Sequence, residues 1–185
     1  MWKIGRLSKV VDRSKFDCGR PELNKWLRTS ATQYEKRDLC RVYVAVQDAD
    51  PTYRAYGYYS LSSHLIEIDL LPPEEAKRLP RLLGVPTVLL GQFGVDVSVQ
   101  KQGLGQLLLM HALTRVVRLS EALGIQAIVV DALDETAREF YIHHGFRQLQ
   151  DDRQHLFLLM RVGRQLIPAA DDDGGDDDDD LEFRP

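Results

Sequence analysis

The sequence predicts an α/β (α+β) domain built around a mixed β-sheet, and three observations support this fold class. The chain has 185 residues, 44% of them hydrophobic, which is enough for one domain with a substantial core. Its centre has the pattern strand, glycine-bearing loop, long helix, strand, and such a βαβ unit implies two parallel strands joined by a crossover. Strand-rich segments on both sides of this unit favour a sheet that also contains antiparallel pairs.

The N-terminal third is expected to contain two strands and one helix. Residues Trp2–Leu7 alternate weakly and predict the first strand. Pro21 favours the first turn of a helix, and apolar residues at helical spacing extend that helix to about Arg37. Residues Arg41–Gln47 are rich in valine and tyrosine and predict the second strand. The apolar positions of the helix are Leu23, Trp26, Leu27, Ala31 and Tyr34.

A long strand is predicted over Tyr56–Asp69, after a turn at Asp50-Pro51. The segment Pro72–Glu75 opens a short helix to Leu79, because proline and acidic residues both favour a helix N-terminus. Residues Val88–Val97 predict the next strand, with an apolar central section.

The second half of the chain predicts two helices and three strands. Apolar residues at helical spacing cover Leu104–Leu123, and Gly124 stands where a helix commonly ends. Residues Ile125–Ala132 predict a buried strand, and Asp134 is placed to cap a helix that runs to about His144. Two closing strands are predicted over Phe146–Leu149 and His155–Val162.

Acidic residues are concentrated at the C-terminus. From Asp171 onward, eight aspartates, Glu182 and a single Arg184 give a net charge of −8, which leaves +4 on the preceding 170 residues. Such a segment cannot bury enough apolar area to offset the entropy of ordering it, so residues 166–185 predict a disordered acidic tail. The tail can serve as a solubilising end, associate with the basic body or compete with nucleic acid. The folded domain is expected over residues 1–165.

The composition also indicates the cellular compartment of the protein. No run of about 18 apolar residues predicts a membrane span, and the N-terminus lacks the apolar core of a secretory signal. Cys18 and Cys40 match neither a metal-binding spacing nor a disulfide framework. We therefore expect a cytoplasmic protein with two unpaired thiols and no metal.

The loop Gln100–Gln106 lies between a predicted strand and the N-terminus of the long helix. Free backbone N–H groups and the helix dipole make this an anion site, and glycine lets the main chain approach a pyrophosphate closely. The pattern is not a P-loop, because Gly105 is followed by Gln106. It is not a dinucleotide fingerprint either, because Leu108 stands where the third glycine would be.

The remaining pattern, Q-x-x-G-x-G after an apolar strand, resembles the acetyl-CoA motif of the GNAT superfamily of N-acetyltransferases. Downstream, Ala137–Phe146 is similar to the A-x-x-F-Y-x-x-x-G-F segment of that superfamily, in the same order along the chain. The resemblance implies a single GNAT domain over residues 1–165, a central sheet with splayed parallel strands flanked by helices, and acetyl-CoA as cosubstrate without a metal.

The resemblance also implies roles for individual residues. Backbone amides of Gln102–Gln106 would hold the pyrophosphate, and the pantetheine arm would pair with Val95–Val97. Relatives often have glycine where this chain has Lys101, whose side chain could equally contact phosphate or face solvent. The residues expected at the cofactor are Val95, Asp96, Val97, Gln100, Lys101, Gln102, Gly103, Leu104, Gly105, Gln106 and Phe140.

Tyr141 matches the family tyrosine that protonates the departing thiolate. Its phenol has to stay protonated at neutral pH, which an ordinary tyrosine pKa of about 10 allows. The alternative is a core tyrosine beside Phe140 and Phe146. No general base stands out, and an α-amine with a pKa of about 7.7–8.0 needs little help to become neutral. By residue type the candidate bases are His64, Glu67, Asp69, Asp131, His143 and His144.

Four further segments narrow the resemblance to the GNAT toxins of type II toxin–antitoxin systems: Phe16–Leu27, Gly57–Leu61, Val85–Gly91 and Val129–Ala132. The similarity covers about residues 10–162. It implies that the chain acetylates the α-amine of aminoacyl-tRNA and so blocks translation, that it forms a homodimer, and that a ribbon-helix-helix antitoxin neutralises it.

Basic residues in three places suit a tRNA substrate, although ordinary solvated helix faces explain them equally well. Two other functions therefore stay open, an acetyltransferase for a small-molecule or protein amine and a non-enzymatic acetyl-CoA-binding module. The basic residues are Arg28, Lys36, Arg37 and Arg41 near the first helix, Lys77, Arg78 and Arg81 before the central unit, and Arg115 and Arg118 on the long helix.

Overall fold

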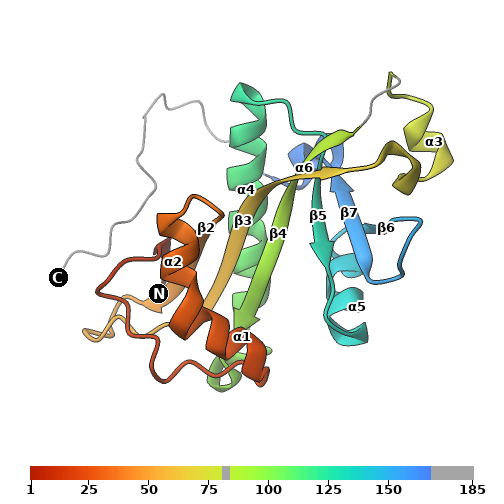
Figure 1. Ribbon diagram of the computed structural model, residues 1–185. Helices are drawn as coiled ribbons and strands as arrows, with labels where there is room; N and C mark the ends of the chain where they lie inside the picture. The colour runs from red at the N-terminus through yellow and green to blue at the C-terminus, as the bar shows by residue number, and fades with distance from the viewer. Residues whose placement is uncertain (81–83, 168–185) are drawn as a thin grey trace. The chain divides into compact units, whose positions relative to one another are not determined.

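The computed structural model describes residues 1–80 and 84–167, which fall into two compact units (Figure 1). Residues 168–185 of the predicted acidic tail lie outside the described residues, as does Arg81. Among the described helices, none is long and apolar enough to cross a membrane. The first unit contains Met1–Leu61 and Gln92–Ala112, and the second contains Ser62–Gly91 and the described residues from Leu113 onward.

Three antiparallel strands form the sheet of the first unit. Strand β1 (Trp2–Arg6) pairs with β2 (Arg41–Gln47), and β2 pairs with the first half of β3 (Gly57–Ile66). The central strand β2 is buried at five consecutive positions, so both of its faces lie in the interior. A strand covered on both faces is expected to be uniformly apolar rather than alternating, which accounts for its valine-rich sequence.

A helical segment, Pro21–Lys36, covers this sheet, and we call it the N-terminal arm. It consists of helix α1 (Pro21–Lys25), a π-helical turn (Trp26–Ser30) and helix α2 (Ala31–Lys36). The sequence predicts a continuous helix here, and the π-helical turn is a departure from it. The backbone N–H of Ala31 donates to Trp26 O, five residues back. The guanidinium of Arg13 donates to Leu27 O (3.1 Å) in the same turn and to Thr32 Oγ1 (2.9 Å).

The core of the first unit joins the arm to the sheet. Leu27 and Ala31 are fully buried in the same cluster as the valines of β2 and Tyr58 of β3. Helix α4 (Leu104–Ala122) comes very close to β3 at Gly57, where a Cβ would lie 2.7 Å from Leu108 Cδ1. Any side chain at Gly57 would therefore force the Leu108 side chain to shift.

The second unit contains the parallel strand pair. Strand β5 (Ala127–Asp131) pairs with β4 (Val85–Val95) from Thr87↔Ala127 to Leu89↔Val129. Both strands continue beyond Leu89 and Val129, so the parallel pairing stops before either strand ends. This early end of the pairing agrees with the splayed parallel strands that the resemblance to GNAT proteins implies.

Antiparallel pairs complete the second unit. Strand β5 pairs with β7 (His155–Leu159), and β7 pairs with β6 (Arg147–Gln148). The strands follow the order β1-β2-β3-β4-β5-β7-β6, which confirms the predicted mixed sheet. Helix α5 (Glu135–His143) begins as predicted, because Asp134 Oδ1 accepts a hydrogen bond from the backbone N–H of Ala137 (2.8 Å).

Three predicted strands have the wrong bounds. The strand expected over Val88–Val97 begins at Val85 and ends at Val95. The strand expected over Tyr56–Asp69 ends at Ile66 and is followed by a 3-10 turn, Ile68–Leu70. The strand expected over His155–Val162 ends at Leu159, and helix α6 (Met160–Leu166) replaces its second half. Tertiary contacts select this helix, because Gly163 packs against Val117 and Arg161 reaches Glu75.

Glu75 is a buried carboxylate of the second unit that three arginines surround. It lies in helix α3 (Pro73–Ala76), and only 6% of its surface is exposed. Its Oε1 accepts hydrogen bonds from Arg147 (2.9 Å) and Arg161 (2.6 Å), and Arg78 lies 3.8 Å from Oε2. Burial opposes ionisation, but these arginines leave the pKa of Glu75 below its ordinary value.

We predict that Glu75→Ala lowers the free energy of unfolding by about 1.5–3 kcal/mol at pH 7, the loss expected for hydrogen bonds to a charged group. Because the pKa of Glu75 is lowered by folding, this contribution is present at neutral pH and is lost as the pH falls through the folded pKa. Urea denaturation at several pH values measures it. The matched control is Glu135→Ala, which removes an exposed carboxylate from Arg138 and Arg153 and should cost less than about 1 kcal/mol. Equal losses in the two variants would contradict this role of Glu75.

Candidate active site

The glycine-bearing loop joins the end of β4 to the start of α4. A 3-10 turn, Val97–Val99, follows the strand, and the backbone then takes positive φ angles at Lys101 (60°) and Gly103 (87°). A Cβ on Gly103 would meet nothing within 4 Å. Glycine is therefore favoured here by the backbone angle rather than by crowding.

The N-terminus of α4 offers unpaired backbone donors beside this loop. Its first intrahelical bond runs from the N–H of Leu107 to Gly103 O (3.0 Å). The preceding amides lie in the first turn, where a helix has no carbonyl partner for them. Lys101 and Gly103 are exposed, whereas the buried side chain of Leu104 anchors the turn. These amides, together with the dipole of a 19-residue helix, suit a pyrophosphate. They belong to Leu104, Gly105 and Gln106.

The buried carboxylate of Asp96 holds the end of β4, and only 1% of its surface is exposed. Its Oδ1 accepts hydrogen bonds from the N–H (3.0 Å) and hydroxyl (2.6 Å) of Ser98. Its Oδ2 accepts from the N–H of Asp17 (3.0 Å) and from the Arg54 guanidinium (3.2 Å). Burial opposes ionisation, yet these four donors leave the pKa of Asp96 lowered. Asp96 therefore braces the loop, and its carboxylate is already occupied by the protein.

The glutamine side chains of the motif also brace the loop. Gln100 donates its Nε2 to Val95 O (2.8 Å) and to Cys18 O (3.2 Å). Gln102 donates its Nε2 to Ser98 O (3.3 Å). The first residue of Q-x-x-G-x-G thus ties the loop to the strand that precedes it, which explains why an amide side chain suits that position.

Two backbone amides predicted to meet a pantetheine arm are already used. The N–H of Asp96 donates to Tyr56 O (2.8 Å), and the N–H of Val97 donates to Asp17 O (2.8 Å). Pairing of pantetheine with Val95–Val97 stays a prediction, and at Asp96 and Val97 it would have to use carbonyl groups.

Tyr141 lies on α5 in the second unit, whereas residues 95–106 lie in the first. It is 5% exposed, and its ring centre lies 5.3 Å from those of Phe140 and Phe146. Burial raises the pKa of Tyr141, so its phenol is protonated at neutral pH. The helix ends at His143, and Gly145, two residues later, has a φ of 90° that favours glycine. Tyr141 is thus a core tyrosine whose phenol is held in its neutral form, and its role as a proton donor stays a prediction.

The neighbouring histidines have a structural explanation. His144 Nδ1 lies 2.7 Å from Phe140 O, one helical turn back, and the two rings are 4.6 Å apart. His143 is exposed at the last position of α5. Both imidazoles stand at a helix C-terminus, where a positive charge is favourable.

The strands of the second unit bring together a different group of titratable residues. His64 Nδ1 lies 3.1 Å from Thr87 Oγ1, and burial together with His155 lowers the pKa of His64, against the effect of Asp131. His155 is paired with Asp131 in the β5–β7 register and lies 2.8 Å from Asp151. The sequence does not single out His155, because only the strand register places it opposite Asp131.

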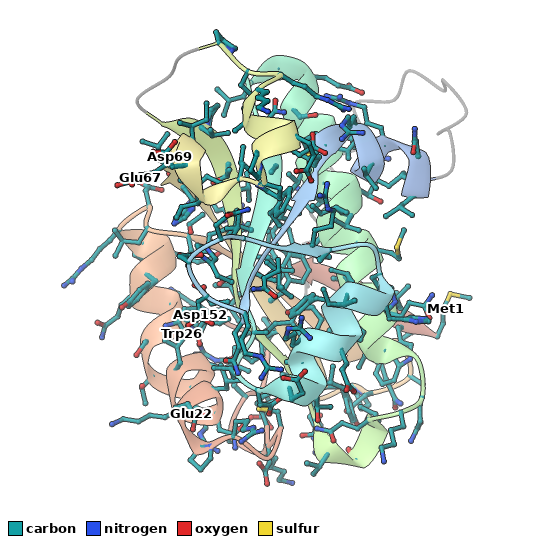
Figure 2. All side chains as sticks on the ribbon, turned by 90° about the vertical axis from the view of Figure 1, so that its right-hand side faces the viewer. Met1, Glu22, Trp26, Glu67, Asp69 and Asp152 are labelled. Carbon is teal, nitrogen blue, oxygen red and sulfur yellow. The ribbon has the colours of Figure 1, made fainter. Side chains whose placement is uncertain are left out.

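The other acidic candidates are surface residues. Glu67 and Asp69 are exposed on the turn that follows β3 (Figure 2). Within residues 1–80 and 84–167, no group of three or more histidine, cysteine, aspartate or glutamate side chains is arranged to hold a metal ion.

We predict that Asp96→Asn destabilises the protein at neutral pH by about 1.5–3 kcal/mol, because it weakens hydrogen bonds to a buried charged group. Folding lowers the pKa of Asp96, so its contribution is present above the unfolded pKa of about 3.9 and is lost as the pH falls through the folded pKa. Denaturant titrations between neutral and acid pH should show the free energies of unfolding of wild type and Asp96→Asn becoming equal as the pH falls. Asp48→Asn, which removes an exposed partner of Lys3, should change little. A difference between wild type and Asp96→Asn that persists in acid would exclude this explanation.

Known proteins with similar sequences are toxins. No protein-family model matches the chain. A tRNA-acetylating toxin of Mycobacterium tuberculosis is 35% identical over 162 residues, which cover 88% of this chain and 94% of that protein. A probable toxin TacT of Sinorhizobium fredii is 28% identical, over 84% of this chain and 89% of that protein.

Solved structures of toxins have the same fold. A tyrosine-to-phenylalanine mutant of KacT matches with a TM-score of 0.85 and 33% identity, over 90% of this chain and 99% of that one. AtaT complexed with acetyl-methionyl-tRNAfMet matches with a TM-score of 0.84 and 31% identity, and the match covers 90% of this chain and 99% of that one. A third match is a tyrosine-to-phenylalanine mutant of AtaT bound to the C-terminus of the antitoxin AtaR and to acetyl-CoA. It has a TM-score of 0.74 and 28% identity, and the match covers 90% of this chain and 97% of that one.

Proposed function

The chain belongs to the family of GNAT toxins that acetylate tRNA, and from this membership we propose that it transfers an acetyl group from acetyl-CoA to the α-amine of an aminoacyl-tRNA. An acetylated α-amine cannot form a peptide bond, so the reaction blocks translation. The observation that carries the proposal is the loop between β4 and α4. There, positive φ angles at Lys101 and Gly103 and the first amides of α4 produce an anion site in the sequence context of the GNAT motif.

Acetyl-CoA is the donor, and residues of the loop hold its pyrophosphate. The backbone amides of Gln102–Gln106 donate to the phosphate oxygens, while Lys101 is exposed beside them and can add a positive charge. Gln100 and Asp96 act indirectly, because their side chains bind the protein rather than the cofactor. Val95, Val97 and Phe140 complete the proposed cofactor contacts.

The transfer is a direct attack of the amine on the thioester. The nitrogen forms a bond to the acetyl carbon and loses a proton to solvent, the bond from that carbon to sulfur breaks, and the thiolate leaves with the electron pair. Tyr141 donates its phenolic proton to the thiolate and recovers one from solvent. Because burial raises the pKa of Tyr141, the phenol keeps its proton throughout the physiological range. The attacking α-amine, with a pKa of about 7.7–8.0, is partly neutral before any base acts.

The N-terminal arm and Arg37, which follows it directly, supply exposed positive charge for RNA. Lys25, Lys36 and Arg37 are exposed, and none forms an ion pair with any part of the chain that the structure describes. Arg28 is exposed as well, and its guanidinium also donates to Phe16 O (3.3 Å). Arg41, by contrast, is paired with Asp38. Cations without an acidic partner are the ones that can neutralise phosphates and release their counterions.

The proposal extends to partners. Charged tRNA is a cytoplasmic molecule, so the protein acts in the cytoplasm. A solved relative bound to the C-terminus of its antitoxin supports neutralisation of this chain by an antitoxin. The resemblance of the sequence to GNAT toxins implies that this antitoxin is of ribbon-helix-helix type. In this proposal the active protein is a homodimer. Sedimentation of the purified chain tests the dimer, and co-expression with the product of a neighbouring small gene tests the antitoxin.

Incubation with labelled acetyl-CoA and bulk charged tRNA tests the reaction. Label should enter the aminoacyl fraction, and Tyr141→Phe should reduce its rate by about 100-fold or more, the range for loss of a general acid. The variant should still bind acetyl-CoA with wild-type affinity. Acetyl-CoA binding without any label in tRNA would contradict the proposal and point to a small-molecule or protein amine. Unchanged turnover by Tyr141→Phe would contradict only the role of the tyrosine.

We predict that the double variant Lys36→Gln/Arg37→Gln binds tRNA more weakly than wild type, and that its affinity depends less on the salt concentration. Removing one cation from a phosphate should reduce the slope of log affinity against log salt concentration by about 0.7–0.9. Affinity for acetyl-CoA should not change. The matched control, Arg138→Gln/Arg153→Gln, removes the same charge from arginines that pair with Glu135. The prediction fails if both double variants have the wild-type slope.

A further inference from the structure

Asn24 is a buried polar side chain on α1, and both ends of its amide are used. Only 6% of its surface is exposed. Its Oδ1 accepts a hydrogen bond from the backbone N–H of Cys18 (2.9 Å), and its Nδ2 donates to Asp17 Oδ1 (2.7 Å). An asparagine held in this way fixes both residues relative to the N-terminal arm.

These bonds determine the shape of a short turn, Asp17–Gly19. Asp17 Oδ1 also accepts a hydrogen bond from the N–H of Gly19 (2.9 Å), whose φ of 80° favours glycine. A Cβ on Gly19 would lie 3.7 Å from Val97 Cγ1, so the turn packs directly against the residue that follows Asp96. The side chain of Asn24 is therefore the link between this turn and the first helix.

The same turn holds the end of β4 and the acetyl-CoA loop through three hydrogen bonds. The N–H of Asp17 donates to Asp96 Oδ2 (3.0 Å), and Asp17 O accepts from the N–H of Val97 (2.8 Å). Cys18 O accepts from Gln100 Nε2 (3.2 Å), the side chain that also bonds Val95 O. The residues that brace the loop thus depend on a segment about 80 residues earlier in the chain.

We propose that Asn24 is a positioning residue for acetyl-CoA binding, which acts through the turn Asp17–Gly19 on Asp96 and Gln100. This inference rests on the proposed function, because it assigns the loop to acetyl-CoA. In the described part of the chain, the side chain of Asn24 hydrogen-bonds to Asp17 and Cys18 and not to the loop or the amides of α4. Its removal frees the turn, relaxes the bonds at Asp96, Val97 and Gln100, and leaves the loop less well ordered for the pyrophosphate.

The experiment compares full-length wild type with Asn24→Ala, using calorimetry for acetyl-CoA affinity and steady-state kinetics with charged tRNA. Both the Kd and the KM for acetyl-CoA should rise about tenfold, the size expected when a hydrogen bond to a charged group is removed. The kcat at saturating acetyl-CoA should stay within about twofold, because Tyr141 is untouched. Asn24→Asp places a second carboxylate against Asp17 and should weaken acetyl-CoA binding at least as much, which provides a second variant of similar size.

Arg13→Ala is the matched control for general loosening of the arm. The Arg13 guanidinium donates hydrogen bonds to Leu27 O and Thr32 Oγ1, which both belong to the arm. Neither bond involves the turn Asp17–Gly19 or the loop. This variant should lower thermal stability but leave the acetyl-CoA Kd unchanged. Wild-type affinity in Asn24→Ala, or equal weakening in Arg13→Ala, would overturn the inference. Wild-type protein that binds no acetyl-CoA would overturn the proposed function and this inference with it.

Discussion

The buried carboxylate of Asp96 is the constraint on which the cofactor loop depends. A charge that is 1% exposed has to be compensated, and here four donors from three places in the chain converge on it. Satisfying this carboxylate fixes where β4 ends, how the 3-10 turn leaves the strand and where the segment at Asp17 lies. The loop Gln100–Gly105 then begins from a defined position. The backbone amides of α4 are therefore exposed to a ligand without the help of another side chain.

The chemistry requires little else that is unusual. In the proposed mechanism the proton donor is Tyr141, whose ordinary acidity is already suitable, and burial beside Phe140 and Phe146 only keeps it protonated. The proposed pyrophosphate site consists of main-chain donors, and among side chains it requires only the glycine at position 103, where φ is 87°. Selection for the amine substrate is therefore expected from the surfaces around the site, above all the exposed cations of the N-terminal arm.

Local patterns predicted most of the fold and the strand–loop–helix segment at which the site is proposed. Helical spacing located α4, continuous apolar runs rich in valine located β2 and β5, and Asp134 marked the start of α5. What the sequence did not predict depends on partners far away in the chain. The π-helical turn is supported by Arg13, α6 replaces a strand because Arg161 reaches Glu75, and Asp17 is 79 residues from Asp96. Such pairings leave no periodicity in the sequence, so no local pattern could reveal them.

The central claim is that the acceptor is the α-amine of an amino acid esterified to tRNA. The most direct measurement is mass spectrometry of the aminoacyl-adenosine released by nuclease digestion after reaction with acetyl-CoA, with uncharged tRNA and a polyamine in parallel. The account predicts an acetyl group on the amino acid of charged tRNA and none on the tRNA bases or the polyamine. An unmodified aminoacyl-adenosine, with acetyl on the polyamine instead, would contradict it.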